Sequence, residues 1–267
     1  MVKHKKRKQG SSPSLRYRAY LESLVFFFGI IALWEISVRG LRVPQYILPG
    51  PIEVGLCISA QLKLLIPHSL YTLQSITIGY FLSIIIAVPL ALLVTYSPFA
   101  HRNIYPLIVF SQLTPKTAIV PLLIIWFGFG LAPKIITTFL VSFFPIIIDA
   151  IVGFKSVPQE MIYLVESMGA SELSIFSQVR LPFALPNLFA GLKVGTALAT
   201  VGAVVAEFVG SDRGLGYLLL RASGELDTKL VFAALITLSF MGLMLYFIIE
   251  LIERIAIPWH ISRRKRQ

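Results

Sequence analysis

Long apolar runs, separated by short polar or proline-rich breaks, dominate the chain. Each run approaches the roughly 20 residues that an α-helix needs to cross a bilayer, and little charge interrupts it. A soluble helical domain would instead show one apolar and one polar face along each helix. The pattern therefore predicts an all-α membrane protein with six transmembrane helices, at residues 21–38, 70–96, 104–127, 135–152, 187–209 and 230–252.

Prolines and glycines indicate where these runs bend and end. A proline-rich break follows the first run, and the residues after it, 52–65, are expected to form a short interfacial helix. The run 104–127 contains Pro106, Pro115 and Pro121. Proline frees a backbone carbonyl that needs a new partner, so we expect this helix to be kinked and to lie inside a bundle.

Residues 155–186 form the one long polar interruption between apolar runs. Pro158 suits a helix start, and the apolar residues after it recur at helical spacing: Met161, Ile162, Leu164, Val165 and Met168. Gly169 stands where a helix C-terminus favours a left-handed residue. Ser171 can cap a second helix, which Pro182 is expected to stop. This stretch predicts two short helices joined by a glycine turn.

Composition and charge agree with a membrane protein. Hydrophobic residues make up 56% of the chain and charged residues 14%, against roughly 25% charged in soluble domains. The formal net charge of +11 is concentrated in basic clusters at residues 3–8 and 263–266. Clusters that flank apolar runs orient a protein in the membrane and contact anionic lipid. We therefore expect lipid contacts and no nucleic-acid partner.

The chain offers no evident catalytic or metal site. Cys57 is the only cysteine, which excludes an intrachain disulfide and a cysteine-based zinc site. The four histidines are scattered through tails and loops, without another histidine or an acid at metal-ligand spacing: His4, His68, His101 and His260. We expect neither a metal nor a cofactor.

The distribution of positive charge predicts the orientation and the division of the chain. With six spans, the side that holds both tails and residues 155–186 carries about twice as many Lys and Arg residues as the other side. The positive-inside rule therefore predicts that both termini and this stretch are cytoplasmic. We expect a disordered, basic cytoplasmic tail at 1–20, a first transmembrane helix with an outer interfacial segment at 21–66, a transmembrane core at 67–252 and a second basic cytoplasmic tail at 253–267.

A sequence signature in the central stretch resembles that of a known family. Gly169 is followed by nine residues and then by Val179-Arg180-Leu181-Pro182. The membrane subunits of binding-protein-dependent ABC importers carry E-A-A, three residues, G, nine residues and I-x-L-P in a cytoplasmic loop, and the spacing from the glycine onward is the same. Upstream, Tyr163-Leu164-Val165 stand at the E-A-A positions, and Glu160 and Glu166 are the nearest acids.

Three further segments extend the resemblance over residues 48–251. They are Leu48-Pro49-Gly50-Pro51, the segment PLLIIWFGFG at 121–130, and Gly214-Leu215-Gly216-Tyr217. All three are similar to the branch of importers that handles nitrate, sulfonates, taurine and pyrimidine-type vitamin precursors. The run that precedes Gly214 favours a pyrimidine or vitamin-precursor transporter, while the other solutes of the branch stay open.

The resemblance implies a type-1 importer permease fold and a set of partners. Two permease copies, expected to be identical, form the pathway, and two cytoplasmic ABC ATPase subunits receive the coupling helices. An extracytoplasmic solute-binding protein delivers the solute. The chain has no G-x-x-x-x-G-K-[ST] phosphate loop, so ATP hydrolysis is expected on another chain. The positions that match the coupling region are Glu166, Gly169, Ala170, Val179, Leu181 and Pro182.

Four charged residues interrupt the apolar runs, and each has two interpretations. Charged groups at membrane depth usually face a cavity or a partner. Asp149, Lys193 and Glu207 lie near the ends of their runs, however, where a side chain can reach the interface by snorkelling. Lys116 lies in the middle of a run beside Pro115 and could attract an anionic solute. Lys116, Glu207 and Asp149 are the candidates for lining a solute pathway.

Small residues recur every four positions in the fifth run, at Gly191, Gly195, Ala199 and Ala203. This spacing allows helix backbones to approach closely. Packing within the chain, a subunit interface and a pathway lining all remain open. Two other functional classes, a membrane-embedded enzyme and a membrane scaffold, also remain; the first would turn over a substrate alone, and the second would bind a partner without ATP-dependent transport.

Overall fold

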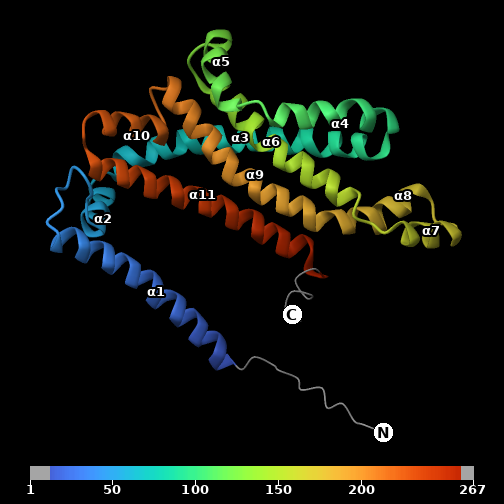
Figure 1. Cartoon of the computed structure of the whole chain (residues 1–267), viewed down its shortest axis with the longest axis horizontal. Coiled ribbons are helices and arrows are strands. Elements are labelled where there is room, and N and C mark those ends of the chain that lie inside the picture. Colours follow the sequence, from blue (N-terminus) through green and yellow to red (C-terminus); the bar gives the residue numbers. More distant parts are fainter. Residues whose placement is uncertain (1–12, 260–267) are drawn as a thin grey trace, which may run out of the picture.

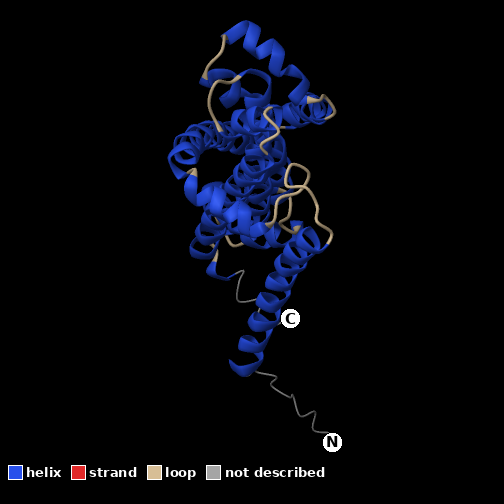
Figure 2. Cartoon of the chain, turned by 90° about the vertical axis from the view of Figure 1, so that its left-hand side faces the viewer, coloured by secondary structure: helices blue, strands red, loops and turns tan. Residues whose placement is uncertain are grey.

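Helices make up almost the whole of the described chain. The computed structural model describes residues 13–259, with side chains from residue 21 onward. Within that range, Figure 2 shows helices joined by loops and no strand. In chain order the elements are α1 (Pro13–Gly40), α2 (Pro51–Ala60), α3 (Leu62–Tyr96), α4 (Pro98–Gln112), the 3₁₀ helix η1 (Lys116–Ile119), α5 (Val120–Phe127), α6 (Leu131–Phe154), α7 (Gln159–Ser167), α8 (Glu172–Ile175), the π-helical turn η2 (Phe176–Arg180), α9 (Leu181–Gly210), α10 (Leu215–Gly224) and α11 (Thr228–Ala256).

The described helices contain five segments that are long and apolar enough to cross a membrane, or six if α4 and α5 together count as one broken span. The all-α class and the number of spans are thus confirmed. The interfacial helix predicted at 52–65 ends earlier, at Ala60, because the backbone leaves helical geometry at Gln61, where φ is −100° and ψ is 16°. Residues 62–65 instead form the first turn of α3, which is 35 residues long.

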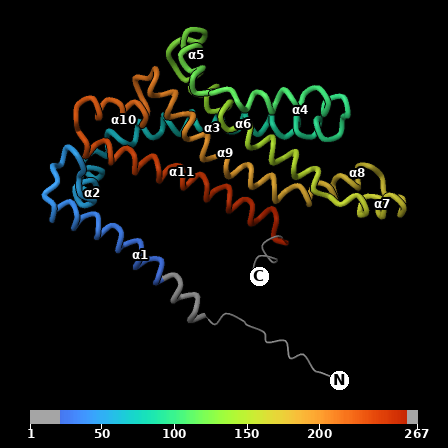
Figure 3. The backbone as a smooth tube through the Cα atoms, viewed as in Figure 1, coloured from blue at the N-terminus to red at the C-terminus, as the bar shows by residue number. Residues whose placement is uncertain are grey.

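The third span differs most from its prediction. Instead of one kinked helix, α4 and the η1–α5 segment meet at an angle of 82°, and Figure 3 shows the tube turning sharply between them. Pro115 disfavours a helical conformation for the residue before it and lacks an N–H of its own. Its ψ of 95° is extended. Pro121 begins a new helix in the first turn of α5, where a missing N–H costs nothing.

The core of the bundle is formed by α3, α6 and α9, and small residues let these helices approach closely. A Cβ atom on Gly191 would lie 2.7 Å from the Cβ of Asp149, and one on Gly195 would lie 2.8 Å from Ile146 Cγ1, both on α6. Ala199 and Ala203 are fully buried. Among the interpretations of this spacing, packing within the chain is therefore confirmed.

The first helix lies apart from the core. Figure 1 shows α1 leaning away from the bundle below α11. Near its C-terminal end the Trp34 and Phe232 rings lie 5.7 Å apart, and the Glu35 carboxylate accepts the Ile52 N–H of α2 at 3.3 Å. α1 already begins at Pro13, so the prediction of disorder is wrong for residues 13–20, where elongation of an existing helix is easier than its nucleation. α11 likewise continues into the predicted C-terminal tail, as far as Ala256. Residues 1–12 and 260–267 of the predicted tails lie outside the described residues.

The bundle has two distinct ends. Figure 1 shows α2 and α10 at one end and α7 and α8 at the opposite end. A long helix connects them, because α8, η2 and α9 form one continuous segment, Glu172–Gly210, of 39 residues. The end with α10 is called the α10 end below, and the end with α7 and α8 is called the loop end.

A buried carboxylate fixes the position of α10. Glu207 of α9 is only 1% exposed. Its carboxylate accepts the Gly216 N–H at 2.7 Å and the Thr72 hydroxyl at 2.9 Å. The Thr72 oxygen in turn accepts the Leu215 N–H at 2.8 Å. Two free N–H groups of the first turn of α10 are thus paired with side chains from α3 and α9, and the negative charge lies at the favourable end of the helix dipole.

This network explains why the Gly214-Leu215-Gly216-Tyr217 segment begins with glycine. Gly214 has a φ of 104°, and a Cβ on it would lie 2.2 Å from the Glu207 carboxylate carbon. Its N–H is 3.0 Å from His68 Nδ1, and the His68 ring stacks at 15° on the ring of Tyr217. Any residue larger than glycine at position 214 would displace the carboxylate, so the turn and the anchor require each other.

We expect Thr72→Val to lower the melting temperature of the purified protein by roughly 4–8 °C. Valine keeps the shape of the side chain but removes the hydroxyl, which leaves the Glu207 carboxylate with the Gly216 N–H alone and Leu215 without an acceptor. Losing such bonds costs about 2 kcal/mol, and 1 kcal/mol corresponds to about 2–4 °C in a chain of this size. Thr77→Val, on the same helix but outside the network, is the matched control. Equal melting temperatures for the two variants would contradict the anchor.

Candidate coupling loop and solute cleft

The loop between α6 and α9 has a small hydrophobic cluster of its own. Val157, Ile162 and Ile175 are buried against one another, and Val165, Ala170 and Val179 pack around them partly exposed. This cluster holds α7 against α8 and η2. Two helices as short as α7 and α8 would not persist in water without such packing. The predicted pair of short helices is therefore present.

The turn between α7 and α8 is a Schellman motif centred on a glycine. Gly169 has a φ of 79°. Its N–H donates to the Glu166 carbonyl at 2.9 Å, and the Ala170 N–H donates to the Val165 carbonyl at 3.3 Å. This pair of bonds defines the motif, and Val165 and Ala170 both pack against the hydrophobic cluster of the loop. Ser171 caps α8, as predicted, by accepting the Ser174 N–H at 3.3 Å.

One part of the predicted loop is wrong. Pro182 does not stop the second helix; it lies in the first turn of α9, which continues to Gly210. The five residues before Leu181 form a π-helical turn, in which the Leu181 N–H bonds to the Phe176 carbonyl. The wider turn accommodates a proline that has no N–H and would crowd an α-helical carbonyl. Arg180 lies over the Tyr96 ring, 4.8 Å from its centroid, and so connects this turn to the end of α3.

The outer surface of the loop exposes large apolar side chains. The exposed fraction is 60% for Tyr163 and Leu164 and 76% for Met168 and Leu173. These four residues are called the loop patch below. Tyr163 and Leu164 occupy the first two E-A-A positions, while the third, Val165, faces the internal cluster. An apolar patch of this kind typically marks a protein interface.

The three predicted pathway residues lie in three different surroundings. Glu207 is buried in the α10 anchor. Asp149 lies half-buried on α6 against Gly191 of α9. Lys116 lies at the break of the third span, where its ammonium donates to the Gln112 carbonyl at 2.7 Å and sits 4.2 Å from the centre of the Phe144 ring. No described cavity brings these three residues together. The fourth charged residue, Lys193, forms an ion pair with Glu253 of α11.

A cleft of about 730 Å³ opens at the α10 end and was missed from the sequence. It is called the α10 cleft and lies among α3, α6, α9 and α10. Aromatic rings and three charged side chains are prominent in its walls. The lining residues are Tyr71, Phe129, Gly130, Lys134, Phe208, Val209, Gly210, Ser211, Asp212, Arg213, Tyr217 and Leu220.

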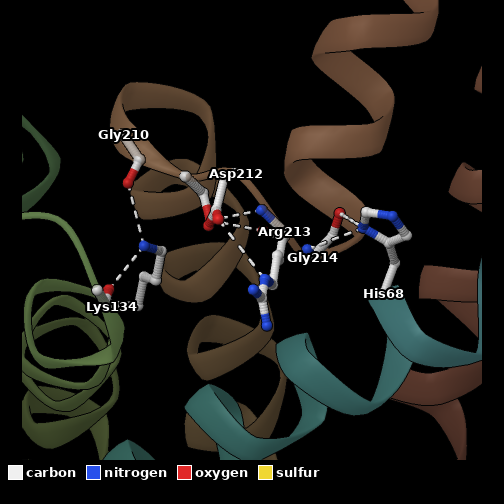
Figure 4. A network of polar contacts seen from close by, with 8 residues as sticks. His68, Lys134, Gly210, Asp212, Arg213 and Gly214 are labelled. Carbon is white, nitrogen blue, oxygen red and sulfur yellow. Dashed lines mark hydrogen bonds and ion pairs between the residues drawn. The ribbon is translucent and has the colours of Figure 1, made fainter.

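Lys134 is the least expected member of this cleft. The sequence indicated only a flanking charge before the fourth run, yet Lys134 is 1% exposed. Its ammonium donates to the carbonyls of Gly130 at 2.6 Å and Gly210 at 3.0 Å, as Figure 4 shows. It thereby satisfies a carbonyl at the C-terminal end of α9, where positive charge is favourable. The one local signal is that a lysine four residues after a glycine can reach back to the carbonyl of that glycine.

The other charges of the cleft are exposed and paired. Asp212 and Arg213 approach to 3.5 Å, with side chains 81% and 70% exposed. Such a pair contributes little to stability and can rearrange to meet a ligand. The three charged residues of the lining are Lys134, Asp212 and Arg213, and together they carry one net positive charge. The cleft can therefore hold a small molecule between aromatic faces and offer it hydrogen-bond donors.

Comparison with known proteins identifies the family. Residues 79–257 match the family described as "Binding-protein-dependent transport system inner membrane component". The chain is 36% identical over 248 residues to the formylaminopyrimidine transport permease protein ThiX of Halalkalibacterium halodurans, covering 92% of this chain and 97% of that protein. It is 38% identical over 235 residues to the riboflavin transport system permease protein RibX of Chloroflexus aurantiacus, covering 87% and 88%.

More distant similarities agree. The taurine transport system permease protein TauC of Escherichia coli is 29% identical over 237 residues, covering 89% of this chain and 86% of that protein. Among solved structures, the inward-facing MetNI methionine ABC transporter superposes with a TM-score of 0.63 at 19% identity, over 73% of this chain and 97% of that one, which shows the same fold. The chain therefore belongs to the family of binding-protein-dependent transport system inner membrane components and is a multi-pass permease subunit of an ABC importer.

Proposed function

We propose that this permease imports a small heteroaromatic solute of the formylaminopyrimidine or riboflavin kind. The relatives with these names are 36% and 38% identical to the chain, against 29% for the taurine permease. The run that precedes Gly214, which resembles that of vitamin-precursor permeases, contributes Phe208, Val209, Gly210 and Ser211 to the wall of a cleft rich in aromatic rings. Sulfonates, taurine and nitrate are the second candidates.

The single observation that carries the mechanism is the glycine turn at the loop end. The loop patch lies on both sides of the Schellman motif at Gly169, next to the start of a continuous segment that runs to the α10 end. In this proposal the loop end and both termini are cytoplasmic, which the excess of positive charge on that side supports. Two ABC ATPase subunits bind the loop patches of two identical permease copies. A solute-binding protein docks at the opposite end.

Closure of the ATPase dimer would move α7 and α8, and α9 would transmit this movement. Glu166, Gly169 and Ala170 form the turn, while Val179, Leu181 and Pro182 join it to α9 through the π-helical turn. Removal of Gly169 should therefore affect energy coupling more than membrane insertion.

We expect Gly169→Val to reduce solute uptake, and ATP hydrolysis stimulated by the loaded binding protein, by at least about tenfold. A β-branched residue at a φ of 79° is strained, so the turn would shift and displace the loop patch. Gly169→Asn should keep most of the activity, because asparagine tolerates this conformation. Both variants should reach the membrane in equal amounts. Equal uptake by the two would contradict the coupling role.

Among the candidate pathway residues, we propose Lys116 as the first to test. Its ammonium lies on an aromatic ring at the break of the third span, whereas the Glu207 carboxylate is engaged in the anchor and Asp149 packs against α9. Lys116→Met should raise the KM for uptake at least threefold without changing the amount of assembled transporter. Unchanged uptake kinetics would remove Lys116 from the pathway.

The solute class can be tested with the complete transporter in vesicles. The purified permease, its ATPase and its binding protein should take up formylaminopyrimidine or riboflavin in an ATP-dependent manner and leave taurine outside. ATP-dependent uptake of taurine alone would favour the second candidate. A chain that purified without any ATPase and turned over a substrate by itself would instead support the membrane enzyme, and stable partner binding without transport would support the scaffold.

A further inference from the structure

We propose that the α10 cleft is a solute-receiving site that binds a planar ring between its aromatic side chains and holds an oxygen of the ring substituent on Lys134 and Arg213. This inference rests on the proposed function and adds a site and a binding mode to it. The cleft does not include Lys116, Asp149 or Glu207, so it is separate from the pathway residues expected from the sequence.

The size and lining of the cleft suit a small organic solute. Sites for such ligands usually have volumes of roughly 300–1,000 Å³ and combine apolar or aromatic walls with a few polar groups. The α10 cleft has about 730 Å³ and four aromatic residues in its walls: Tyr71, Phe129, Phe208 and Tyr217. Phe129 is 81% exposed and Phe208 41% exposed, so ring surface is available to a ligand. Flat aromatic faces favour a planar ring over a compact aliphatic solute.

The polar groups of the cleft favour a solute that accepts hydrogen bonds. The Lys134 ammonium and the Arg213 guanidinium are the cationic donors in its wall. Two carbonyls hold the ammonium in place, while the guanidinium is exposed and paired with Asp212 at 3.5 Å. Glu207 lies behind the wall, where Thr72 and Gly216 hold its carboxylate. Two of the three ammonium N–H groups are thus engaged, so the third, together with the exposed guanidinium, is left to donate to a ring that carries a carbonyl or anionic oxygen, in a lining with one net positive charge.

Contacts within the protein also fix one wall of the cleft before a ligand binds. One side is the turn that precedes α10, which the Glu207–Thr72 anchor holds, and the His68 ring backs Tyr217. A wall with fixed side chains loses little freedom when a ligand binds, which increases affinity. The exposed Asp212–Arg213 pair is the one charged part of the lining that is free to adjust.

The single native cysteine makes a direct test possible. In a Cys57→Ser background, Leu220→Cys places a thiol in the cleft without changing its rings or charges, and Arg221→Cys places one on the neighbouring residue outside the lining. Both native residues are exposed. The complete transporter in vesicles is labelled with a membrane-impermeant maleimide. Labelling rates are compared with the unloaded binding protein and with the protein loaded with formylaminopyrimidine, riboflavin or taurine.

We expect at least one ring-bearing solute to slow labelling of Leu220→Cys threefold or more and to leave Arg221→Cys unchanged. Shielding by the docked binding protein would affect both neighbours, so the difference between them reports occupation of the cleft. Adding Arg213→Gln or Phe129→Leu to Leu220→Cys should abolish the protection. Unchanged labelling of Leu220→Cys with every solute, or protection by taurine alone, would overturn the proposal.

Uptake in the same vesicles separates this inference from the proposed function. If the native transporter accumulates a ring-bearing solute while Leu220→Cys is not protected, the cleft proposal fails and the function stands. If no ring-bearing solute is accumulated but one of them protects Leu220→Cys, the solute class of the function fails and the site stands. The absence of both effects overturns both.

Discussion

The arrangement of the α10 end depends on one buried carboxylate. An ionisable group that is 1% exposed must be paired or hydrogen-bonded, because its transfer from water is costly. Glu207 meets this requirement by binding a backbone N–H of α10 and the hydroxyl of Thr72, which binds a second N–H. The carboxylate thus replaces the local cap that α10 lacks. It joins the consecutive helices α9 and α10 to α3, which is distant in sequence, and one wall of the α10 cleft follows from their fixed positions.

The need of buried polar groups for hydrogen-bond partners also explains why Lys134 is buried. At the end of α9 the last carbonyls have no intrahelical donors, and a buried carbonyl needs a partner from another element. Lys134 reaches from α6 to the Gly210 carbonyl while it also binds the carbonyl of Gly130. Glu207 therefore accepts a backbone N–H at the start of α10, and Lys134 donates to a backbone carbonyl at the end of α9.

The two ends of the molecule are mechanically continuous. The segment from Glu172 to Gly210 extends about 58 Å if it rises 1.5 Å per residue. It begins directly after the turn at Gly169 and carries Glu207 near its far end, and its small residues pack tightly on α6. The π-helical turn near its start lets Pro182 remain within this helix, so a movement of the loop need not be lost at a break.

How far the sequence predicts this protein depends on whether a feature is local. The class, the number of spans, the Gly169 turn and the Ser171 cap were predicted, because apolar run length and helix-end chemistry are set by neighbouring residues. The Gly-Leu-Gly-Tyr segment was recognised only as a likeness, since its reason is the side chain of Glu207 in another helix. The third span was expected to be kinked and is instead broken by 82°, because how a chain continues after a proline such as Pro115 depends on what it packs against.

The sequence by itself determined that this chain lies in a membrane and that its central stretch forms two helices with a glycine turn. Only the tertiary structure decided that Pro182 continues a helix, that Glu207 anchors α10 instead of lining a described cavity, and that Lys134 lies buried in a cleft wall. The physical reason is the same in each case. A backbone N–H or carbonyl without a local partner takes one from whichever helix packs beside it, and the sequence of one helix does not specify that neighbour.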